Sequence, residues 1–525
     1  MRVPEHSRGV RRAAMGGFVL FLAMGPLLSP VGVAAEPAVS EEVTETDAIP
    51  GDGFTYLGMI RPRHAREIES SNWAVGAETM DRDYTIYNNW RNYLGPLGVK
   101  KARIQSGWAK TEKEKGKYDW AWLDEIIPDM VAQGVEPWVC LCYGNTIYAG
   151  GGGTGLSGGL PSSPEALEAW DAYVGAIVDR YGEYVDEWEL WNEPRTGRGE
   201  GAVTYAKFAA RTAEVIRRRQ PQARLMLPAG GAFDAVFAEQ VLTWLRDHGK
   251  LALANEIIYH PYAYNPDEKY GAVEKLREIV RSFSPDITLR QGENGVPSRI
   301  GSFGAVSKYD WNEQRQAKWA TRRLLGDLGR DIPSSYFAIC DMAYRVRPDR
   351  RDSDFRDDQS ELKLLINSKG LLEINPDRTI HHAKRAYRAV QHVTALFDDS
   401  VERIRDFEAK LSGGMEDASY SIFGYRAADG SLVITLWRAS DTPGKRPDLE
   451  NVVLTIPQGV FRDPVWVDVL SGRVYDIDAK LWEAHDGGTT FTQLPVYDSA
   501  VVIAERAWTG DHMKASPNAV REVSQ

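Results

Sequence analysis

Apolar and polar positions follow a regular order between about residues 70 and 345. Short apolar runs are separated by longer stretches with the periodicity of amphipathic helices, such as Pro164–Tyr181, Thr204–Arg219, Tyr270–Phe283 and Asn312–Leu328. The short runs predict eight strands, which are Trp73–Ala77, Lys101–Gln105, Glu136–Cys142, Val185–Trp191, Arg224–Pro228, Glu256–His260, Thr288–Gly292 and Tyr336–Cys340.

Strands that alternate with helices indicate βαβ units and a parallel sheet. Eight such units over about 275 residues fit the size of a (β/α)8 TIM barrel. A doubly wound sheet is the alternative, but no glycine-rich phosphate-binding turn follows the first predicted strand. We therefore predict an α/β fold whose barrel occupies residues 61–398.

The pattern changes from about residue 400 onward. Short apolar runs separated by Gly, Pro and Asp predict strands at Tyr420–Tyr425, Leu432–Trp437, Val452–Ile456, Val465–Asp468 and Ala500–Ala504. This indicates an all-β module, a C-terminal β-sandwich at residues 399–510, followed by a frayed tail at 511–525. A chain of 525 residues has room for one large barrel and one smaller module.

The N-terminus resembles an export signal. A segment with Arg2, Arg8, Arg11 and Arg12 precedes an apolar run from Ala13 to about Leu28, and small residues lie just before Glu36. The run is shorter than the roughly 20 residues that span a bilayer, so a membrane anchor is the weaker alternative. We predict a signal peptide at residues 1–35, a secreted or periplasmic protein, and a mobile acidic leader at residues 36–60.

Charge and cysteine content narrow the classes of partner. The first 35 residues carry four Arg and one Glu, so their removal changes the net charge from −11 to −14. An acidic surface argues against nucleic acid and anionic membrane as partners. Three cysteines do not make a disulfide framework, and no His/Cys cluster has metal-ligand spacing. We expect no metal and no cofactor; the oligomeric state stays open.

Two glutamates lie where a barrel places its chemistry, at the C-terminal ends of strands. Glu193 follows the fourth predicted strand, where Pro194 fixes the backbone, and Glu293 ends the seventh between Gly292 and Gly295. Cleavage of a glycosidic bond with retention needs two carboxyl groups about 5–5.5 Å apart. The sequence therefore predicts Glu193 as general acid/base and Glu293 as nucleophile.

The segment Trp191-Asn192-Glu193-Pro194 resembles the acid/base signature of clan GH-A, the large barrel clan of retaining glycosidases. In that clan the acid/base Glu follows Asn on strand four and the nucleophile Glu ends strand seven. The resemblance implies that Arg103 holds the nucleophile ionised and that His260 and Tyr262 lie beside it. Gly370-Leu371-Leu372 and Lys384-Arg385-Ala386-Tyr387 are similar to the barrel exit of families grouped with β-xylosidases and α-L-iduronidases, family 39 in particular.

The resemblance covers residues 70–400 loosely and the two glutamate motifs closely. It departs at strand eight, which we expect to end in Cys340-Asp341-Met342 where many clan members have a Trp. Asn192 and three further residues at predicted strand ends, Glu78, Tyr143 and Asn145, are candidate sugar contacts. The glycine-rich loop Gly150–Gly159 is expected to form a flexible rim over the cleft.

These observations predict a secreted retaining glycosidase that acts on a carbohydrate substrate. A transglycosidase with the same two residues is an alternative, because only water access differs. A non-catalytic carbohydrate-binding barrel is a second alternative, although both glutamates are present. The sugar and the linkage stay open.

Overall fold

The computed structural model describes residues 47–156, 158–346 and 363–515. The predicted signal peptide, the first part of the leader and the tail from residue 516 lie outside the described residues. In the part of the chain that the structure describes, no helix is long and apolar enough to cross a membrane.

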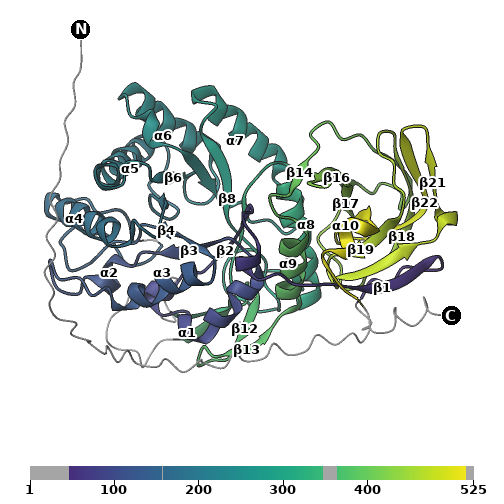
Figure 1. The fold of residues 1–525 in the computed structure, drawn as a ribbon. Coiled ribbons are helices and arrows are strands. Elements are labelled where there is room, and N and C mark those ends of the chain that lie inside the picture. Colours follow the sequence, from purple (N-terminus) through teal and green to yellow (C-terminus); the bar gives the residue numbers. More distant parts are fainter. Residues whose placement is uncertain (1–46, 157, 347–362, 516–525) are drawn as a thin grey trace, which may run out of the picture. The chain divides into compact units, whose positions relative to one another are not determined.

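Eight parallel strands form a closed barrel in chain order (Figure 1). They are β2 (Trp73–Gly76), β3 (Lys101–Gln105), β4 (Glu136–Cys140), β5 (Glu187–Glu189), β6 (Arg224–Pro228), β7 (Glu256–Tyr259), β8 (Thr288–Asn294) and β9 (Ser334–Tyr336). The barrel closes where β9 pairs with β2, with Trp73 opposite Ser334. The (β/α)8 prediction is confirmed.

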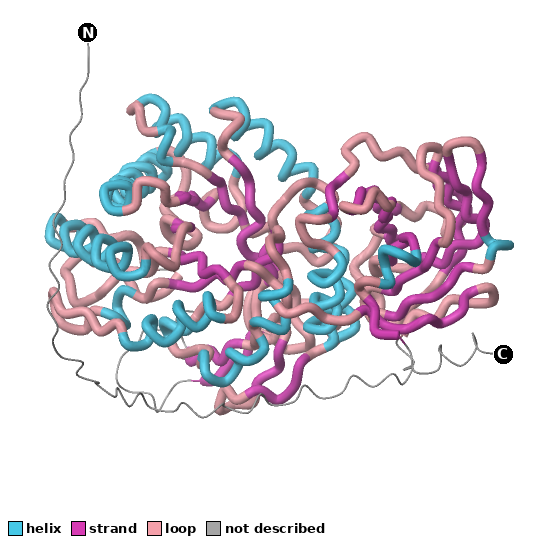
Figure 2. The backbone as a smooth tube through the Cα atoms, in the orientation of Figure 1, coloured by secondary structure: helices cyan, strands magenta, loops and turns pink. Residues whose placement is uncertain are grey.

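Helices cover the outside of the barrel, and Figure 2 distinguishes them from the strands. The long ones are α3 (Ala121–Ala132), α4 (Pro164–Tyr181), α5 (Glu200–Arg219), α6 (Ala235–Asp247), α7 (Tyr270–Phe283), α8 (Glu313–Leu328) and α9 (Arg385–Leu396). Three of these helices have a side-chain N-cap. The side chains of Ser163, Asp234 and Asn312 each accept a hydrogen bond from the backbone N–H of the residue three positions later. Short helices α1 (Tyr87–Trp90) and α2 (Trp108–Thr111) lie between barrel strands, and α10 (Arg506–Gly510) comes near the C-terminus.

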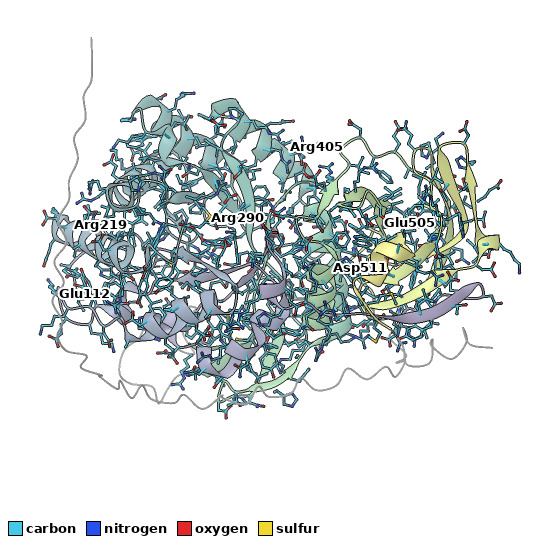
Figure 3. The ribbon with its side chains drawn as sticks, viewed as in Figure 1. Glu112, Arg219, Arg290, Arg405, Glu505 and Asp511 are labelled. Carbon is cyan, nitrogen blue, oxygen red and sulfur yellow. The ribbon has the colours of Figure 1, made fainter. Side chains whose placement is uncertain are left out.

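The barrel interior is layered around Trp138. This fully buried ring packs with Ala74, Met226 and Ile258. On one side lies the guanidinium of Arg290, which is labelled at the centre of the barrel in Figure 3 and pairs with Glu187 at 2.7 Å. The guanidinium of Arg103 lies 5.7 Å from the Trp138 ring. Trp138 is therefore a core residue that supports the polar groups above it.

The C-terminal region forms two antiparallel sheets, which confirms the predicted sandwich. The larger sheet has the order β14-β16-β17-β23-β19-β20-β1-β24, and the smaller one has the order β15-β18-β22-β21. The bounds are β14 (Val401–Arg403), β15 (Lys410–Gly413), β16 (Tyr420–Ala427), β17 (Leu432–Arg438), β18 (Glu450–Ile456), β19 (Pro464–Asp468), β20 (Arg473–Ile477), β21 (Trp482–His485), β22 (Gly488–Val496) and β23 (Val501–Glu505). Ile434, Leu454, Trp466 and Phe491 belong to the core between the sheets.

Two predicted boundaries are wrong. Strand β1 (Phe54–Ile60), expected in a mobile leader, pairs with β20 and with β24 (Met513–Ala515), expected in a frayed tail. The ring of Phe54 packs at 6.3 Å from that of Trp466, so the strand has a place in the sandwich core. The acidic composition of residues 36–50 does not extend to this apolar segment.

Two small hairpins complete the chain between barrel and sandwich. One pairs β10 (Met342–Val346) with β11 (Lys363–Asn367). The other pairs β12 (Leu372–Ile374) with β13 (Ile380–Ala383) and leads into α9. Both follow β9, so they lie in the connection that leaves the last barrel strand.

Candidate active site

Glu193 and Glu293 come together at the C-terminal ends of the barrel strands. Glu293 is the last residue but one of β8, and Glu193 lies four residues after the end of β5. One carboxylate oxygen of each residue and one ring nitrogen of His260 all lie within 4.8 Å of one another. The two strand ends that the sequence singled out therefore meet at one point.

The backbone after β5 turns sharply to present Glu193. Trp191 and Glu193 have φ angles of 85° and 43°, in the left-handed region that non-glycine residues rarely adopt. Such residues cost about 1–3 kcal/mol each and persist where surrounding contacts hold them. Here Asn192, between them, accepts a hydrogen bond from Arg103 at 2.7 Å and donates one to the Tyr143 hydroxyl at 2.6 Å. These bonds fix the turn.

Two donors hold the carboxylate of Glu293. The Tyr262 hydroxyl donates to Oε1 at 2.7 Å, and Nη1 of Arg103 donates to Oε2 at 3.0 Å. Burial raises the pKa of Tyr262 far above its usual range and the charge of Glu293 raises it further, so this hydroxyl keeps its proton. The two donors together fix both oxygens of the Glu293 carboxylate in position.

Arg103 on β3 is fixed by several further groups. Its Nε and Nη2 donate to the two oxygens of Glu189, both at 2.7 Å. Nη1, which reaches Glu293, also donates to Oε1 of Glu78 at 2.7 Å. Trp138 donates its indole hydrogen to Glu189 at 3.0 Å. A fully buried guanidinium with this many partners has one orientation available, so it positions Glu293 rigidly.

Glu193 has its own neighbours. Nδ1 of His260 lies 2.9 Å from Oε1, and Nη2 of Arg195 lies 3.6 Å from Oε2. Burial lowers the pKa of His260, but the charge of Glu293 and the hydrogen bond to Glu193 raise it by more, and the net shift is upward. His260 also lies 3.7 Å from Glu293 and so connects the two carboxylates.

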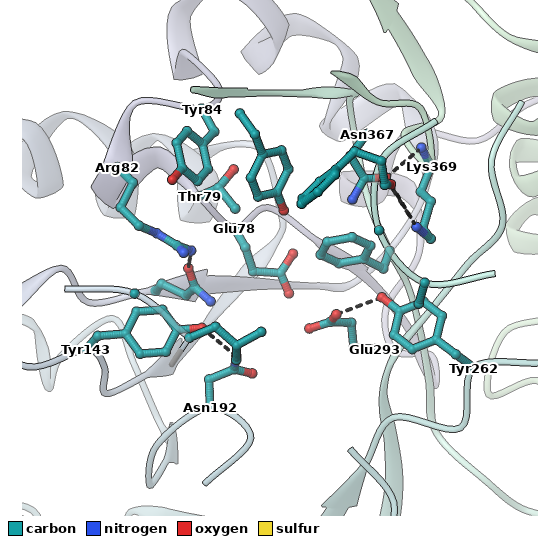
Figure 4. A pocket seen from close by; sticks show the side chains of 18 of the residues that line it. Glu78, Thr79, Arg82, Tyr84, Tyr143, Asn192, Tyr262, Glu293, Asn367 and Lys369 are labelled. Atoms are coloured by element: carbon teal, nitrogen blue, oxygen red, sulfur yellow. Dashed lines mark hydrogen bonds between the residues drawn. The ribbon is translucent and has the colours of Figure 1, made fainter. Parts of the chain in front are cut away.

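A cavity of about 410 Å³ opens beside Glu293, as Figure 4 shows, and Glu193 is not among the residues that line it. Glu78, Tyr143, Asn192, Tyr262 and Glu293 line it, and Glu78 lies near its middle. Its size is within the usual range for small-molecule sites. Burial raises the pKa of Glu78 to about 7, against the opposing effect of Arg103, and the charge of Glu293 adds to the rise.

Solved structures with a similar fold are glycoside hydrolases. A family 39 glycoside hydrolase from the gut symbiont Bacteroides cellulosilyticus superposes with a TM-score of 0.56 at 17% identity, over 85% of this chain and 83% of that one. A monomeric β-xylosidase from Caulobacter crescentus gives 0.51 at 16%, over 86% and 97%. The family 39 enzyme from Xanthomonas axonopodis pv. citri gives 0.51 at 16%, over 85% and 95%.

These likenesses establish the fold. They extend over the barrel and the sandwich, since 85% or more of this chain is covered in each case. The sequence matches no family model and no curated protein.

One predicted sugar contact lies elsewhere. Asn145 is buried, and its Nδ2 donates to the backbone oxygen of Glu112 at 2.8 Å. It is not among the residues that line the cavity. Its amide is used to hold the loop after β4, which argues against the predicted contact. Of the other predicted residues, Glu78, Arg103, Tyr143, Asn192 and Tyr262 form one hydrogen-bonded group with Glu293. His260 is hydrogen-bonded to Glu193 and lies 3.7 Å from Glu293.

The end of the eighth barrel strand differs from the prediction. β9 ends at Tyr336, so the residue at the rim is Phe337, which lines the cavity. Asp341, expected near this rim, is instead fully buried and 2.6 Å from Nζ of Lys384. Burial raises the pKa of Asp341 to about 6 in spite of that cation. The rim of strand eight therefore carries an aromatic ring, three residues before Cys340, where the expected segment begins.

Two cations in the cavity wall were not predicted. Arg82 donates to Gln105 at 2.5 Å and places its guanidinium 4.9 Å from the Tyr143 ring. Lys369 follows β11 and is almost fully buried. Burial lowers the pKa of Lys369 to about 7, although Glu293 and Asp341 counteract the shift. No signal in the sequence marks Lys369, because its burial depends on contacts between segments that are distant along the chain.

Other features of the site bear on the predictions. Gly155 and Leu156 of the glycine-rich loop line the cavity, as expected of a rim. Glu193, His260 and Glu293 have the side chains of a metal site, but Arg103 already supplies a positive charge to Glu293. We assign no metal to these three residues.

Proposed function

We propose that this protein is a retaining glycoside hydrolase that cleaves O-glycosidic bonds of oligo- or polysaccharides. The observation that carries the proposal is the approach of the two carboxylates to within 4.8 Å. Retaining enzymes hold this pair about 5–5.5 Å apart, whereas inverting enzymes need roughly 6.5–9.5 Å to admit a water. An approach this close supports the retaining arrangement.

In the first step Glu293 attacks the anomeric carbon of the sugar. An ester bond forms between its oxygen and that carbon, the bond to the leaving oxygen breaks, and Glu193 gives its proton to that oxygen. Tyr262 and Arg103 hold the Glu293 carboxylate in position before the attack. Glu78, Asn192 and Tyr143 are placed in the cavity to bind sugar hydroxyls.

In the second step Glu193, now ionised, takes a proton from water. The water oxygen attacks the anomeric carbon, the ester bond to Glu293 breaks, and the sugar leaves with its original configuration. The charge of Arg103 stabilises Glu293 as it becomes a carboxylate again. A transglycosidase would use the same two steps with a sugar hydroxyl in place of water.

Family 39 is the family that the sequence motifs and the fold likeness support. The solved relatives include a β-xylosidase, so aryl β-xylosides are the first substrates to test. Aryl β-glycosides of other sugars and plant or bacterial polysaccharides form the rest of the panel. Product analysis with an added acceptor sugar distinguishes hydrolysis from transglycosylation.

The anomer released first tests the mechanism. For a β-glycoside, proton NMR during early turnover is expected to show the β-anomer before mutarotation; the α-anomer would mean inversion and would overturn the proposal. Glu293→Gln serves as the inactive control. If the panel contains a sugar that binds but none that is cleaved, the carbohydrate-binding alternative is correct.

We further propose that the protein is exported. The basic and then apolar segment at residues 2–28, followed by small residues before Glu36, supports a cleaved signal peptide. N-terminal sequencing of the protein from the medium or periplasm should begin near residue 36. A cytoplasmic protein that still carries residues 1–35 would contradict this.

A further inference from the structure

A second group of metal-ligand side chains lies on the hairpin between β12 and β13. Glu373, His381 and His382 each offer one ligand atom, and these three atoms lie within 4.8 Å of one another. We call these three residues the hairpin site. It is separate from the carboxylate pair, because it shares no residue with the cavity lining or with the Arg103 group. Its role does not depend on the proposed glycosidase activity.

An irregularity in the hairpin explains how two adjacent histidines face one point. Neighbours in a strand normally point to opposite faces of the sheet. In this hairpin Glu373 pairs with His382, but the next pair is Ile374 with Ile380, so His381 is an extra residue without a counterpart. A bulge of this kind puts two residues opposite one and re-aims their side chains. Both imidazoles thereby reach the same side as Glu373.

One ring nitrogen of His381 and one of His382 already lie close together. Nδ1 of His381 lies 2.7 Å from Nδ1 of His382. Two nitrogens bound to one tetrahedral Zn²⁺ at about 2.0–2.1 Å lie roughly 3.4 Å apart, so the rings need to separate by only about 0.7 Å. Arg299 pairs with Oε1 of Glu373 at 3.5 Å, and Oε2 of Glu373 lies 4.0 Å from Nε2 of His382. Two nitrogens and one oxygen are thus available.

A fourth residue fixes the orientation of His382. Its Nε2 lies 2.7 Å from Oε1 of Glu313, in the first turn of α8, and the other oxygen of Glu313 accepts a hydrogen bond from the backbone of Arg385 at 3.0 Å. When Nε2 donates its hydrogen to Glu313, Nδ1 keeps its lone pair on the side of His381. A carboxylate behind a histidine in this way is the usual arrangement around bound metal ions.

From this geometry we propose that the hairpin site binds one divalent transition-metal ion of the Zn²⁺ type, through Nδ1 of His381, Nδ1 of His382 and the carboxylate of Glu373. Two imidazoles and one carboxylate suit Zn²⁺ better than Ca²⁺ or Mg²⁺, which prefer oxygen ligands. His381 is exposed and His382 is partly exposed, so the ion has an entry path and water can take the fourth position. The bound ion would tie the hairpin to the start of α8 through His382 and Glu313.

Cobalt provides the direct test, because tetrahedral Co²⁺ absorbs visible light. Protein without a polyhistidine tag is titrated with Co²⁺ and, in parallel, with Zn²⁺ by calorimetry. We expect one ion per chain, displacement of Co²⁺ by Zn²⁺, and a higher melting temperature with Zn²⁺. His382→Gln and His381→Gln should abolish the cobalt spectrum. Glu313→Gln should weaken binding about 10–100-fold, because only the support of His382 is lost.

Two controls separate this site from others. His485→Gln removes an exposed histidine of β21 and should leave binding unchanged. The double variant Glu193→Gln, Glu293→Gln removes both carboxylates from the other group of ligand residues, Glu193, His260 and Glu293. This variant should also bind one ion. The proposal is overturned if the wild type binds no ion, if His382→Gln binds as tightly as the wild type, or if only the Glu193/Glu293 double variant loses binding. Circular dichroism of each variant checks that it is folded.

Discussion

Nδ1 of His260 lies 2.9 Å from Oε1 of Glu193, at the C-terminal end of the barrel. Among the described residues the imidazole makes no second hydrogen bond, because its Nε2 is buried and unbonded and Glu293 lies 3.7 Å from Nδ1. Its one hydrogen bond therefore goes to the proposed acid/base. Oε1 is occupied by this bond, and Oε2 is the oxygen left to exchange a proton with substrate and water.

Replacement of His260 should damage proton transfer in particular. We expect His260→Ala to lower kcat/KM about 10–100-fold on substrates with poor leaving groups, since a misaligned Glu193 protonates them slowly. Activated aryl glycosides need little protonation and should lose only a few-fold. The measurement is kcat/KM across aryl glycosides of increasing leaving-group pKa. Equal losses across the series would mean that His260 does not act through Glu193.

The two glutamates should respond differently to azide. Glu193→Ala should lose about 10²–10⁴-fold in turnover of an activated aryl glycoside, because no base activates the water. Azide needs no base, so it should restore the rate and give a glycosyl azide of retained configuration. Glu293→Ala should be inactive on every substrate, and azide should give, if anything, the opposite anomer.

Product NMR and rate measurements with and without azide check this assignment. Asn145→Ala is a suitable control, since its amide holds a backbone oxygen outside the cavity. The roles are reversed if azide restores Glu293→Ala with retained configuration and leaves Glu193→Ala inactive.

The sequence was sufficient for the barrel and for most of the hydrogen-bonded group around Glu293. Apolar runs locate buried strands, and strand ends locate the barrel mouth, so Glu193 and Glu293 could be placed from their positions. Arg103 and Tyr262 were expected from the resemblance of the motifs to those of clan GH-A. The strand-eight rim was misplaced because Ser334–Tyr336 is too short and polar to register as an apolar run. Lys369 and the irregularity at His381 depend on contacts between distant segments, which periodicity does not encode.

The buried charge of Lys369 should destabilise the fold at low pH. Burial lowers the pKa of Lys369 to about 7, whereas in the unfolded chain the amine has its ordinary pKa of about 10.4. Between pH 7 and about 10.4 the unfolded chain binds a proton that the folded protein lacks, so the free energy of unfolding rises with pH across this range. Below pH 7 both states carry the proton, and the destabilisation by the buried charge is at its full size. Lys369→Met should therefore raise the free energy of unfolding by roughly 3–5 kcal/mol at pH 6 and by less at pH 9.

Urea unfolding at the two pH values measures this effect. Lys384→Met is the matched control, because Lys384 is equally buried but lies 2.6 Å from Asp341. Its removal leaves a buried carboxylate without its cation and should destabilise the protein. If Lys369→Met is less stable than the wild type at pH 6, Lys369 has an anionic partner in the folded protein.

Glu78 should show the opposite dependence on pH. Burial raises its pKa to about 7, so between about pH 4.5 and 7 the folded protein holds a proton that the unfolded chain has lost. Stability due to this group therefore falls as pH rises through that range and is lowest above pH 7. Glu78→Gln, which resembles the protonated form, should match the wild type at pH 5 and exceed it by roughly 2–4 kcal/mol at pH 8. Guanidinium unfolding at both pH values would show whether the two stability curves diverge in this direction.

Strand β1 has a consequence for the order in which the molecule is made. Phe54 pairs with Ile477, so the first strand of the large sandwich sheet is synthesised more than 400 residues before its partner. At about 5–20 residues per second, it waits roughly 20–80 s with its edge open. The whole barrel is completed within that interval. The sheet can close only after nearly the entire chain has left the ribosome, so a protein cut short anywhere before β20 retains an unpaired N-terminal strand that is prone to pair with other chains.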